Sequence, residues 1–114
     1  MSPGEIHLTL FPFGGRVVGT KARPALLLTG RIGPIPEVLA AYITTVIPGV
    51  HLPTDLVLDP GRPEHRGTGL KSRSLLRLHK LITIHDSNLL RYLGKVSAST
   101  QAEVEARLRL LLRL

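Results

Sequence analysis

Arg23 is the side chain of this sequence best placed to bind an anion. It stands in the stretch Lys21-Ala22-Arg23-Pro24, between a glycine-rich segment and the apolar run 25–29. Proline has no backbone N–H to donate, so it suits the first position of a strand, and it keeps the residue before it extended. We therefore expect a guanidinium at the start of a strand, able to grip two phosphate oxygens at once. The alternative is that Arg23 is an ordinary surface cation, one of fifteen lysines and arginines.

Histidine is the residue type here that can move protons near neutral pH, because its ordinary pKa is about 6.5. The chain has five histidines and no cysteine. The lack of cysteine excludes disulfides, zinc–thiolate sites and cysteine nucleophiles. No spacing among the histidines is typical of a metal site, so we expect neither a metal nor a cofactor.

The charge balance indicates a polyanionic partner. The formal net charge is +7, which favours nucleic acid first, a membrane surface second and an acidic protein third. Charge of this kind supplies affinity and salt dependence but no choice of sequence. The four aromatic residues, Phe11, Phe13, Tyr42 and Tyr92, are too few for a broad base-stacking platform.

The length and hydropathy predict one domain, residues 1–114. No apolar run approaches the roughly 20 residues that span a bilayer. The N-terminal residues lack the basic and apolar regions of a signal peptide. We therefore expect a cytoplasmic protein with no membrane association.

Short strands and one helix are the elements that must position these side chains. Alternating or β-branched apolar residues predict strands at 4–13, 25–29, 38–47, 53–58, 74–84 and 94–97, the fifth bent near His79 and Lys80. Glycine and proline predict loops at 14–22 and 30–37. The polar segment 59–69 is expected to be a mobile surface loop, and 86–92 a short capped turn.

Residues 100–114 predict a helix. Thr100 and Glu103 have the spacing of a capping box. The apolar residues that share one face are Val104, Leu108, Leu111 and Leu112. We expect this face to pack on the sheet, with a partner surface as the alternative. Together the elements favour a small antiparallel β-barrel, or a strongly bent sheet, with a helix laid on it.

Four segments, in order, resemble the PemK/MazF family of bacterial toxins. They are Gly4-Glu5-Ile6 with Phe11-Pro12-Phe13; 21–28 (KARPALLL); Tyr42-Ile43-Thr44-Thr45 followed by Leu52-Pro53-Thr54; and Gly69-Leu70-Lys71-Ser72 through Leu76-Arg77-Leu78 to Leu93-Gly94-Lys95-Val96-Ser97. The ordered set covers nearly the whole chain. The resemblance implies a mainly β fold, an SH3-like antiparallel barrel of the CcdB/PemK kind with a C-terminal helix, usually assembled as a homodimer.

The same resemblance implies the toxin of a type II toxin–antitoxin system. Such a toxin is expected to be a metal-independent, sequence-specific endoribonuclease that cleaves single-stranded RNA. Attack by the 2′-hydroxyl would leave 2′,3′-cyclic phosphate and 5′-hydroxyl ends. The resemblance also implies an antitoxin whose acidic disordered tail covers the RNA groove, and the charge of +7 agrees with both partners.

The family's functional residues carry over onto particular positions of this sequence. Arg23 matches the arginine held to stabilise charge on the scissile phosphate, and Thr44 matches the threonine that pairs with it, with Thr45 as the alternative. Arg77 matches an arginine proposed as general acid in one branch. His79 falls where many relatives carry Asp or Glu, which leaves the acid and base open: His79 is either a proton-transfer group or a surface histidine. RNA-binding roles are expected for Arg16, Lys21, Arg31, Thr45, Arg62 and Arg66.

Two further functions stay open at this stage. One is a non-enzymatic poison of the same fold that acts on DNA gyrase, although the terminal sequence 109–114 does not resemble that protein. The other is an inactive barrel that only binds RNA or protein. The presence of both Arg23 and Thr44 disfavours the inactive barrel.

Overall fold

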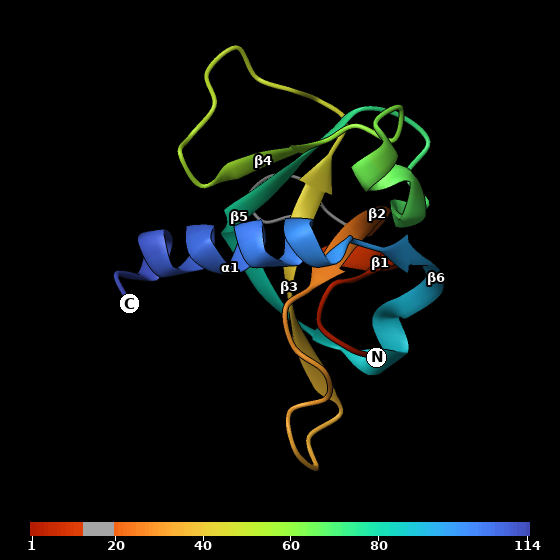
Figure 1. Ribbon diagram of the computed structural model, residues 1–114. Coiled ribbons are helices and arrows are strands. Elements are labelled where there is room, and N and C mark those ends of the chain that lie inside the picture. Colours follow the sequence, from red (N-terminus) through yellow and green to blue (C-terminus); the bar gives the residue numbers. More distant parts are fainter. Residues whose placement is uncertain (13–19) are drawn as a thin grey trace.

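One antiparallel sheet and a C-terminal helix make up the fold (Figure 1). The computed structural model describes residues 1–12 and 20–114, with side chains described for 1–10 and 22–114. The strands are β1 (Glu5–Pro12), β2 (Thr20–Leu27), β3 (Glu37–Thr44), β4 (Asp55–Leu58), β5 (Ser74–His85) and β6 (Leu89–Lys95), and the helix is α1 (Ala98–Leu112). Two 3₁₀ turns, η1 (Pro63–Thr68) and η2 (Asp86–Asn88), flank β5.

The strand order gives the sheet its barrel-like form. The strands lie in the order β4-β5-β3-β2-β1-β6, and every neighbouring pair is antiparallel. The last strand thus lies beside the first, because β6 pairs with β1. The sheet bends strongly and α1 lies across it (Figure 1). The mainly β, barrel-like fold expected from the sequence is confirmed, although the sheet is not closed.

Two apolar clusters bury the two faces of the central strands. The larger one contains Ile6, Leu26, Ala41, Ile43, Leu58, Leu76, Leu78, Val96 and Val104. Its member Val104 comes from α1 and is fully buried, so the helix does pack on the sheet. The smaller one contains Ala25, Leu27, Val38, Ala40 and Ile84. Since successive side chains of a strand point to opposite faces, burial on both faces explains the unbroken apolar runs of β2 and β3.

The start of β2 differs from the sequence prediction. The strand begins at Thr20 rather than at residue 25, so Pro24 lies inside it. Pro24 is opposite Leu8 of β1, whereas β3 pairs with β2 only from Ala25 onward. One side of β2 is therefore unpaired at Pro24, which is a position where a strand tolerates proline. Arg23 consequently projects from within a strand and not from its first residue.

Other boundaries are corrected as well. Segment 59–69 was expected to be a loop without regular structure, but it contains η1, in which His65 and Thr68 are buried. Residues 89–92 belong to β6 and not to a turn. The bend in β5 is confirmed, because the register shifts opposite the step from Ala41 to Tyr42.

The start of α1 also differs, because Ser97 caps the helix. The Ser97 hydroxyl accepts a hydrogen bond from the Thr100 N–H at 3.2 Å. The expected capping box of Thr100 and Glu103 is therefore wrong, and Glu103 instead binds Arg107 at 2.8 Å. Of the expected apolar face, Leu112 is exposed, while the other members pack on the larger cluster. None of the described helices is long and apolar enough to cross a bilayer.

Candidate functional site

Arg23 and Thr44 line one hollow beside the ends of β2 and β3. The register sets Ala25 opposite Tyr42. Arg23 lies two residues before Ala25 and Thr44 two residues after Tyr42, so in this antiparallel pair both project from the same face. The hollow has a volume of about 190 Å³, and we call it the threonine pocket. It is lined by Ala22, Arg23, Pro24, Tyr42, Ile43, Thr44, Thr45, Val46 and Ser74.

Both side chains are held in useful orientations. The buried Thr9 hydroxyl donates to the Arg23 carbonyl oxygen at 3.1 Å, which fixes the backbone under the guanidinium. The Thr44 hydroxyl oxygen accepts from the Val46 N–H at 3.1 Å, so its hydrogen can be donated to a ligand. Arg23 and Thr44 are half-buried, neither sealed in the core nor fully in solvent. The pair is arranged to donate hydrogen bonds to an anion.

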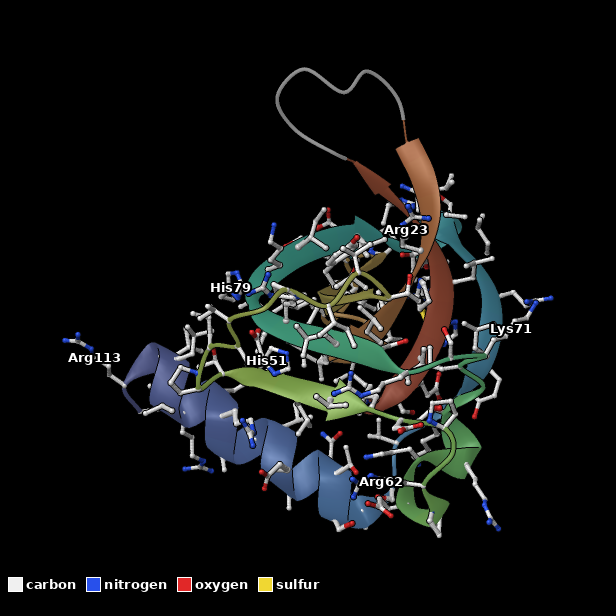
Figure 2. The ribbon with its side chains drawn as sticks, turned by 90° about the horizontal axis from the view of Figure 1, so that it is seen from above. Arg23, His51, Arg62, Lys71, His79 and Arg113 are labelled. Carbon is white, nitrogen blue, oxygen red and sulfur yellow. The ribbon has the colours of Figure 1, made fainter. Side chains whose placement is uncertain are left out.

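A larger hollow continues from the threonine pocket. This lysine pocket has a volume of about 540 Å³. It is lined by Leu8, Ala22, Arg23, Pro24, Thr45, Gly69, Leu70, Lys71, Ser72, Ser74, Arg91 and Leu93. The two pockets share Arg23, Thr45 and three other residues. The two pockets therefore adjoin at Arg23, and together we call them the groove. Figure 2 labels Arg23 and Lys71 in the same half of the view.

The cations of this groove have no counter-ion in the described part of the chain. Arg23, Lys71 and Arg91 form no ion pair or hydrogen bond with the described side chains, and no carboxylate lines either pocket. Like charges gathered in this way repel one another unless an anion neutralises them. The sequence had not predicted binding roles for Lys71 and Arg91.

Two glycines bring Lys71 and Arg91 together. Gly69 has φ +73°, a left-handed conformation that favours glycine, and a Cβ there would collide with the Leu93 carbonyl of β6. A Cβ on Gly94 would likewise collide with the backbone of Gly67 and its neighbour. The segment after η1 therefore rests directly on the backbone of β6. Gly94 is the first residue of the predicted strand 94–97, but the structure places it inside β6, where a glycine often marks such a close approach.

Arg77 and His79 lie beside Asp55 and not in the groove. The Arg77 Nε and Nη2 atoms donate to the two Asp55 carboxylate oxygens, each at 3.2 Å. The His79 Nδ1 atom is 3.9 Å from Asp55 Oδ1. Neither residue lines the threonine or lysine pocket, and Figure 2 labels His79 in the opposite half of the view from Lys71. Arg77 is nevertheless opposite Tyr42 in the register, which makes it a diagonal neighbour of Thr44.

Asp55 is ionised and holds the Arg77 side chain in place. Burial alone would raise the pKa of Asp55, but hydrogen bonds from the Leu52 N–H and from the Arg77 guanidinium outweigh it. The net result is a pKa below the ordinary value of an aspartate, so the carboxylate is ionised at neutral pH. An arginine keeps its proton in proteins, and this partner holds the guanidinium in place. The geometry suits a fixed positive charge better than a proton donor.

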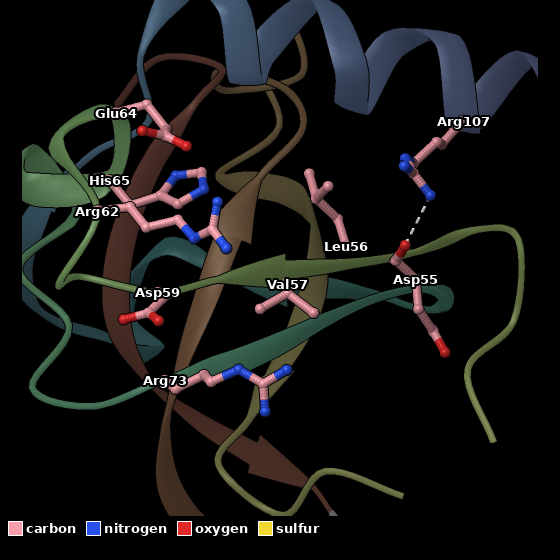
Figure 3. Close-up of a pocket in the computed structure, with 9 residues that line it drawn as sticks. All are labelled: Asp55, Leu56, Val57, Asp59, Arg62, Glu64, His65, Arg73 and Arg107. Carbon is pink, nitrogen blue, oxygen red and sulfur yellow. Dashed lines mark hydrogen bonds between the residues drawn. The ribbon is translucent and has the colours of Figure 1, made fainter. Parts of the chain in front are cut away.

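Arg62 lies in a separate hollow of about 400 Å³, the arginine pocket (Figure 3). Figure 3 shows Arg62 and His65 at one end and Arg107 of α1 at the other, where Arg107 donates to the Asp55 carbonyl oxygen at 2.8 Å. The complete lining is Asp55, Leu56, Val57, Asp59, Arg62, Glu64, His65, Arg73 and Arg107. Three arginines and three acidic residues line this pocket, although the Asp55 carboxylate is paired with Arg77 and Arg107 with Glu103. The pocket therefore differs from the groove, which no carboxylate lines.

The remaining predicted binding residues are scattered. Thr45 lines both pockets of the groove. Arg66 is exposed on η1 and does not line the groove, and Arg31 pairs with Asp86 on the surface. Arg16 and the side chain of Lys21 lie outside the described residues. Within residues 1–12 and 20–114, no group of three or more histidines and acids is arranged to hold a metal ion.

Comparisons with known proteins agree with this architecture. Residues 2–112 match the family described as PemK-like, MazF-like toxin of type II toxin-antitoxin system. Among solved structures, the Mycobacterium tuberculosis toxin MazF-mt6 is 26% identical with a TM-score of 0.74, over 96% of this chain and 97% of the other. None of the proteins of curated function matches the chain.

Two further solved structures share the fold at lower identity. A mycobacterial endoribonuclease in complex with its cognate antitoxin is 22% identical with a TM-score of 0.74, over 100% of this chain and 96% of the other. A MazE–MazF complex from Deinococcus radiodurans is 21% identical with a TM-score of 0.71, over 99% and 95% of the two chains.

Proposed function

Because the chain belongs to the family of PemK-like, MazF-like toxins of type II toxin–antitoxin systems, we propose that it is a sequence-specific endoribonuclease. Its substrate is single-stranded RNA, and its reaction needs no metal ion. The observation that carries the proposal is that Arg23 and Thr44 line the same pocket, in a groove that no carboxylate lines. A similarly folded mycobacterial protein is itself described as an endoribonuclease.

RNA supplies its own nucleophile in this reaction. The 2′-oxygen attacks the adjacent phosphorus, loses its proton to a base, and forms a new O2′–P bond. The P–O5′ bond then breaks and the leaving oxygen takes up a proton, which gives 2′,3′-cyclic phosphate and 5′-hydroxyl ends. The intermediate carries extra negative charge on its non-bridging oxygens, where preorganised donors lower the barrier.

Arg23 and Thr44 are the donors that we assign to these oxygens. The guanidinium offers two parallel N–H groups to the phosphate, and the Thr44 hydroxyl donates from the neighbouring strand. Arg77 adds positive charge from β5. Its Nε and Nη2 atoms bind Asp55, so its charge acts on the phosphate from beside the groove, whose two pockets it does not line.

His79 is the histidine that we test for proton transfer. It lies beside the Asp55–Arg77 pair and lines neither pocket that holds Arg23, so direct transfer requires the bound RNA to extend from the groove to this pair. The assignment predicts that the pH dependence of cleavage loses one ionisation in the His79→Gln protein. A profile that keeps its shape assigns His79 to the surface and moves the proton transfer to another group.

The test of the function is a cleavage assay with end-group analysis. Purified protein is incubated with single-stranded RNA in EDTA, and the fragments are examined for 2′,3′-cyclic phosphate and 5′-hydroxyl ends. We expect both ends at a short recurring sequence. Fragments with 5′-phosphate ends, or cleavage abolished by EDTA, contradict the mechanism. In the same preparation we expect no inhibition of DNA gyrase supercoiling, which excludes the non-enzymatic alternative.

We further propose that the protein acts as a homodimer inhibited by an antitoxin with an acidic, disordered tail. Solved structures of similar fold contain antitoxin partners, and the charge of +7 favours an acidic one. Light scattering of the free protein measures the first claim. Competition between an acidic antitoxin peptide and RNA measures the second.

A further inference from the structure

We propose that the lysine pocket is a nucleotide subsite, in which Lys71 and Arg91 hold the phosphate next to the scissile one. The proposal rests on the ribonuclease function, because it places the scissile phosphate at Arg23. Arg23 borders both pockets, so an RNA strand that crosses it enters the lysine pocket directly.

The first argument is uncompensated charge. Lys71 and Arg91 come from different elements, converge on one hollow, and have no acidic partner among the residues that line it. Arg73, only two residues from Lys71, lies instead in the arginine pocket with Asp59 and Glu64. Neither cation forms an ion pair within the described residues, but carboxylates line the pocket of Arg73 and none lines the pocket of Lys71. An anion bound in the lysine pocket relieves the repulsion there.

The second argument is the apolar lining. Leu8 is opposite Pro24 of β2 and Arg91 of β6, so the three side chains form a row across the sheet. Leu70 and Leu93 also line this pocket. Cations beside an aliphatic wall suit a nucleotide, with its phosphate at the cations and its sugar and base against the wall. No aromatic ring lines the pocket, so we expect phosphate recognition with little base preference at this position.

The third argument is preorganisation. The backbone contact that Gly69 and Gly94 permit fixes the Lys71 segment on the strand that carries Arg91. The backbone segments that carry the two cations are therefore fixed relative to each other before any ligand binds, and only the two exposed side chains must be ordered on binding. Neither side chain donates a hydrogen bond within the described residues, so its removal leaves no orphaned partner.

The experiment compares two double variants with equal loss of charge. Lys71→Ala/Arg91→Ala removes the two cations that line the lysine pocket alone and keeps Arg23, which lines both pockets. Arg73→Ala/Lys95→Ala, the control, removes one cation from the same segment and one from the same strand, and neither lines the groove. The probe is a fluorescent RNA with 2′-O-methyl riboses, which binds but lacks the nucleophile, and affinity is measured over a range of salt concentrations.

We expect the Lys71/Arg91 variant to bind at least about tenfold more weakly at 0.1 M salt, with the control within about twofold of wild type. The slope of log affinity against log salt should fall by about 0.7, the value for one phosphate contact on a single strand. A second probe carries one uncharged methylphosphonate next to the scissile position. It should weaken wild-type binding and leave the variant unchanged, because the contact is already absent.

Several results overturn the subsite. Equal weakening in both double variants indicates general charge attraction, and an equal methylphosphonate effect in wild type and variant places the phosphate elsewhere. Loss of binding to an acidic peptide with RNA binding intact assigns the pocket to a protein partner. Lys71→Gln/Arg91→Gln must repeat the result, which guards against a folding defect. Because the probe is never cleaved, the affinities and salt slopes are independent of whether the protein proves to be a ribonuclease, whereas the methylphosphonate comparison uses the cleavage position found in the cleavage assay.

Discussion

The ion pair between Asp55 and Arg77 gives the strongest prediction about the stability of this fold. The Asp55 side chain is 1% exposed and that of Arg77 is 19% exposed, and two hydrogen bonds of 3.2 Å join them. Asp55 also accepts from the Leu52 N–H at 2.8 Å. In Asp55→Ala the guanidinium loses its partner inside the protein, and the Leu52 N–H loses its acceptor.

The expected cost of Asp55→Ala is about 3 kcal/mol. Breaking a buried pair by removing one partner typically costs about 3–5 kcal/mol, and the partial exposure of Arg77 reduces this through solvation. For a chain of 114 residues, about 3 kcal/mol corresponds to a fall of about 12 °C in Tm. Urea denaturation and thermal melting measure the two quantities.

A double-mutant cycle isolates the pair. Arg77→Ala leaves the buried Asp55 carboxylate unpaired, so it should cost about as much as Asp55→Ala. The double variant should be less destabilised than the sum of the two by about 2 kcal/mol, since neither charge is then left alone. Additive effects, or a cost below about 1 kcal/mol for Asp55→Ala, would show that solvent screens the pair and that Arg77 is not held by Asp55.

Three further outcomes follow from other contacts. The pKa of Asp55 is lowered on folding, so this carboxylate contributes fully to the free energy of unfolding above its unfolded pKa of about 3.9. The contribution is lost as the pH falls through the lower folded pKa. Urea titrations at several pH values should show this loss in wild type and not in Asp55→Asn. Ser97→Ala removes the α1 cap and should cost about 1 kcal/mol in urea denaturation, whereas Glu103→Ala, which leaves the cap intact, should cost less. Gly94→Ala pushes the Gly67 segment off β6; it should cost at least about 2 kcal/mol and also weaken RNA binding, and an unchanged RNA affinity in the folded variant contradicts the proposed preorganisation of Lys71.

The sequence predicted those elements that a local run of residues determines. Apolar and β-branched runs identified the strands β2 and β3, and the bend near His79 appeared as predicted. It could not reveal where β2 begins, because that depends on its pairing with β1. Nor could it choose the cap of α1, since Ser97 and Thr100 are both good cap residues and the packing of α1 on the sheet selects between them.

The site was predictable only in its central part. Arg23 was identified by its place before Pro24 and by the family resemblance, and Thr44 by the resemblance alone; the register now sets them on one face. Lys71 and Arg91 escaped notice because they are distant in sequence and meet only through the contact between the Gly67–Gly69 segment and β6. The partner of Arg77 was equally hidden, because Asp55 reaches it only once β5 lies between β3 and β4. Such juxtapositions come from long-range pairing, which a single sequence does not display.

The central claim is that Arg23 and Thr44 act on the same phosphodiester. The measurement that tests it most directly is the single-turnover cleavage rate of one RNA by wild type, Arg23→Ala, Thr44→Val and the double variant, each shown to be folded. We predict that Arg23→Ala lowers the rate by about 10²–10³, and that the double variant is less impaired than the product of the single effects because the two donors share one charge. A folded Arg23→Ala protein that cleaves at the wild-type rate, or fully multiplicative effects of the two substitutions, would contradict the account.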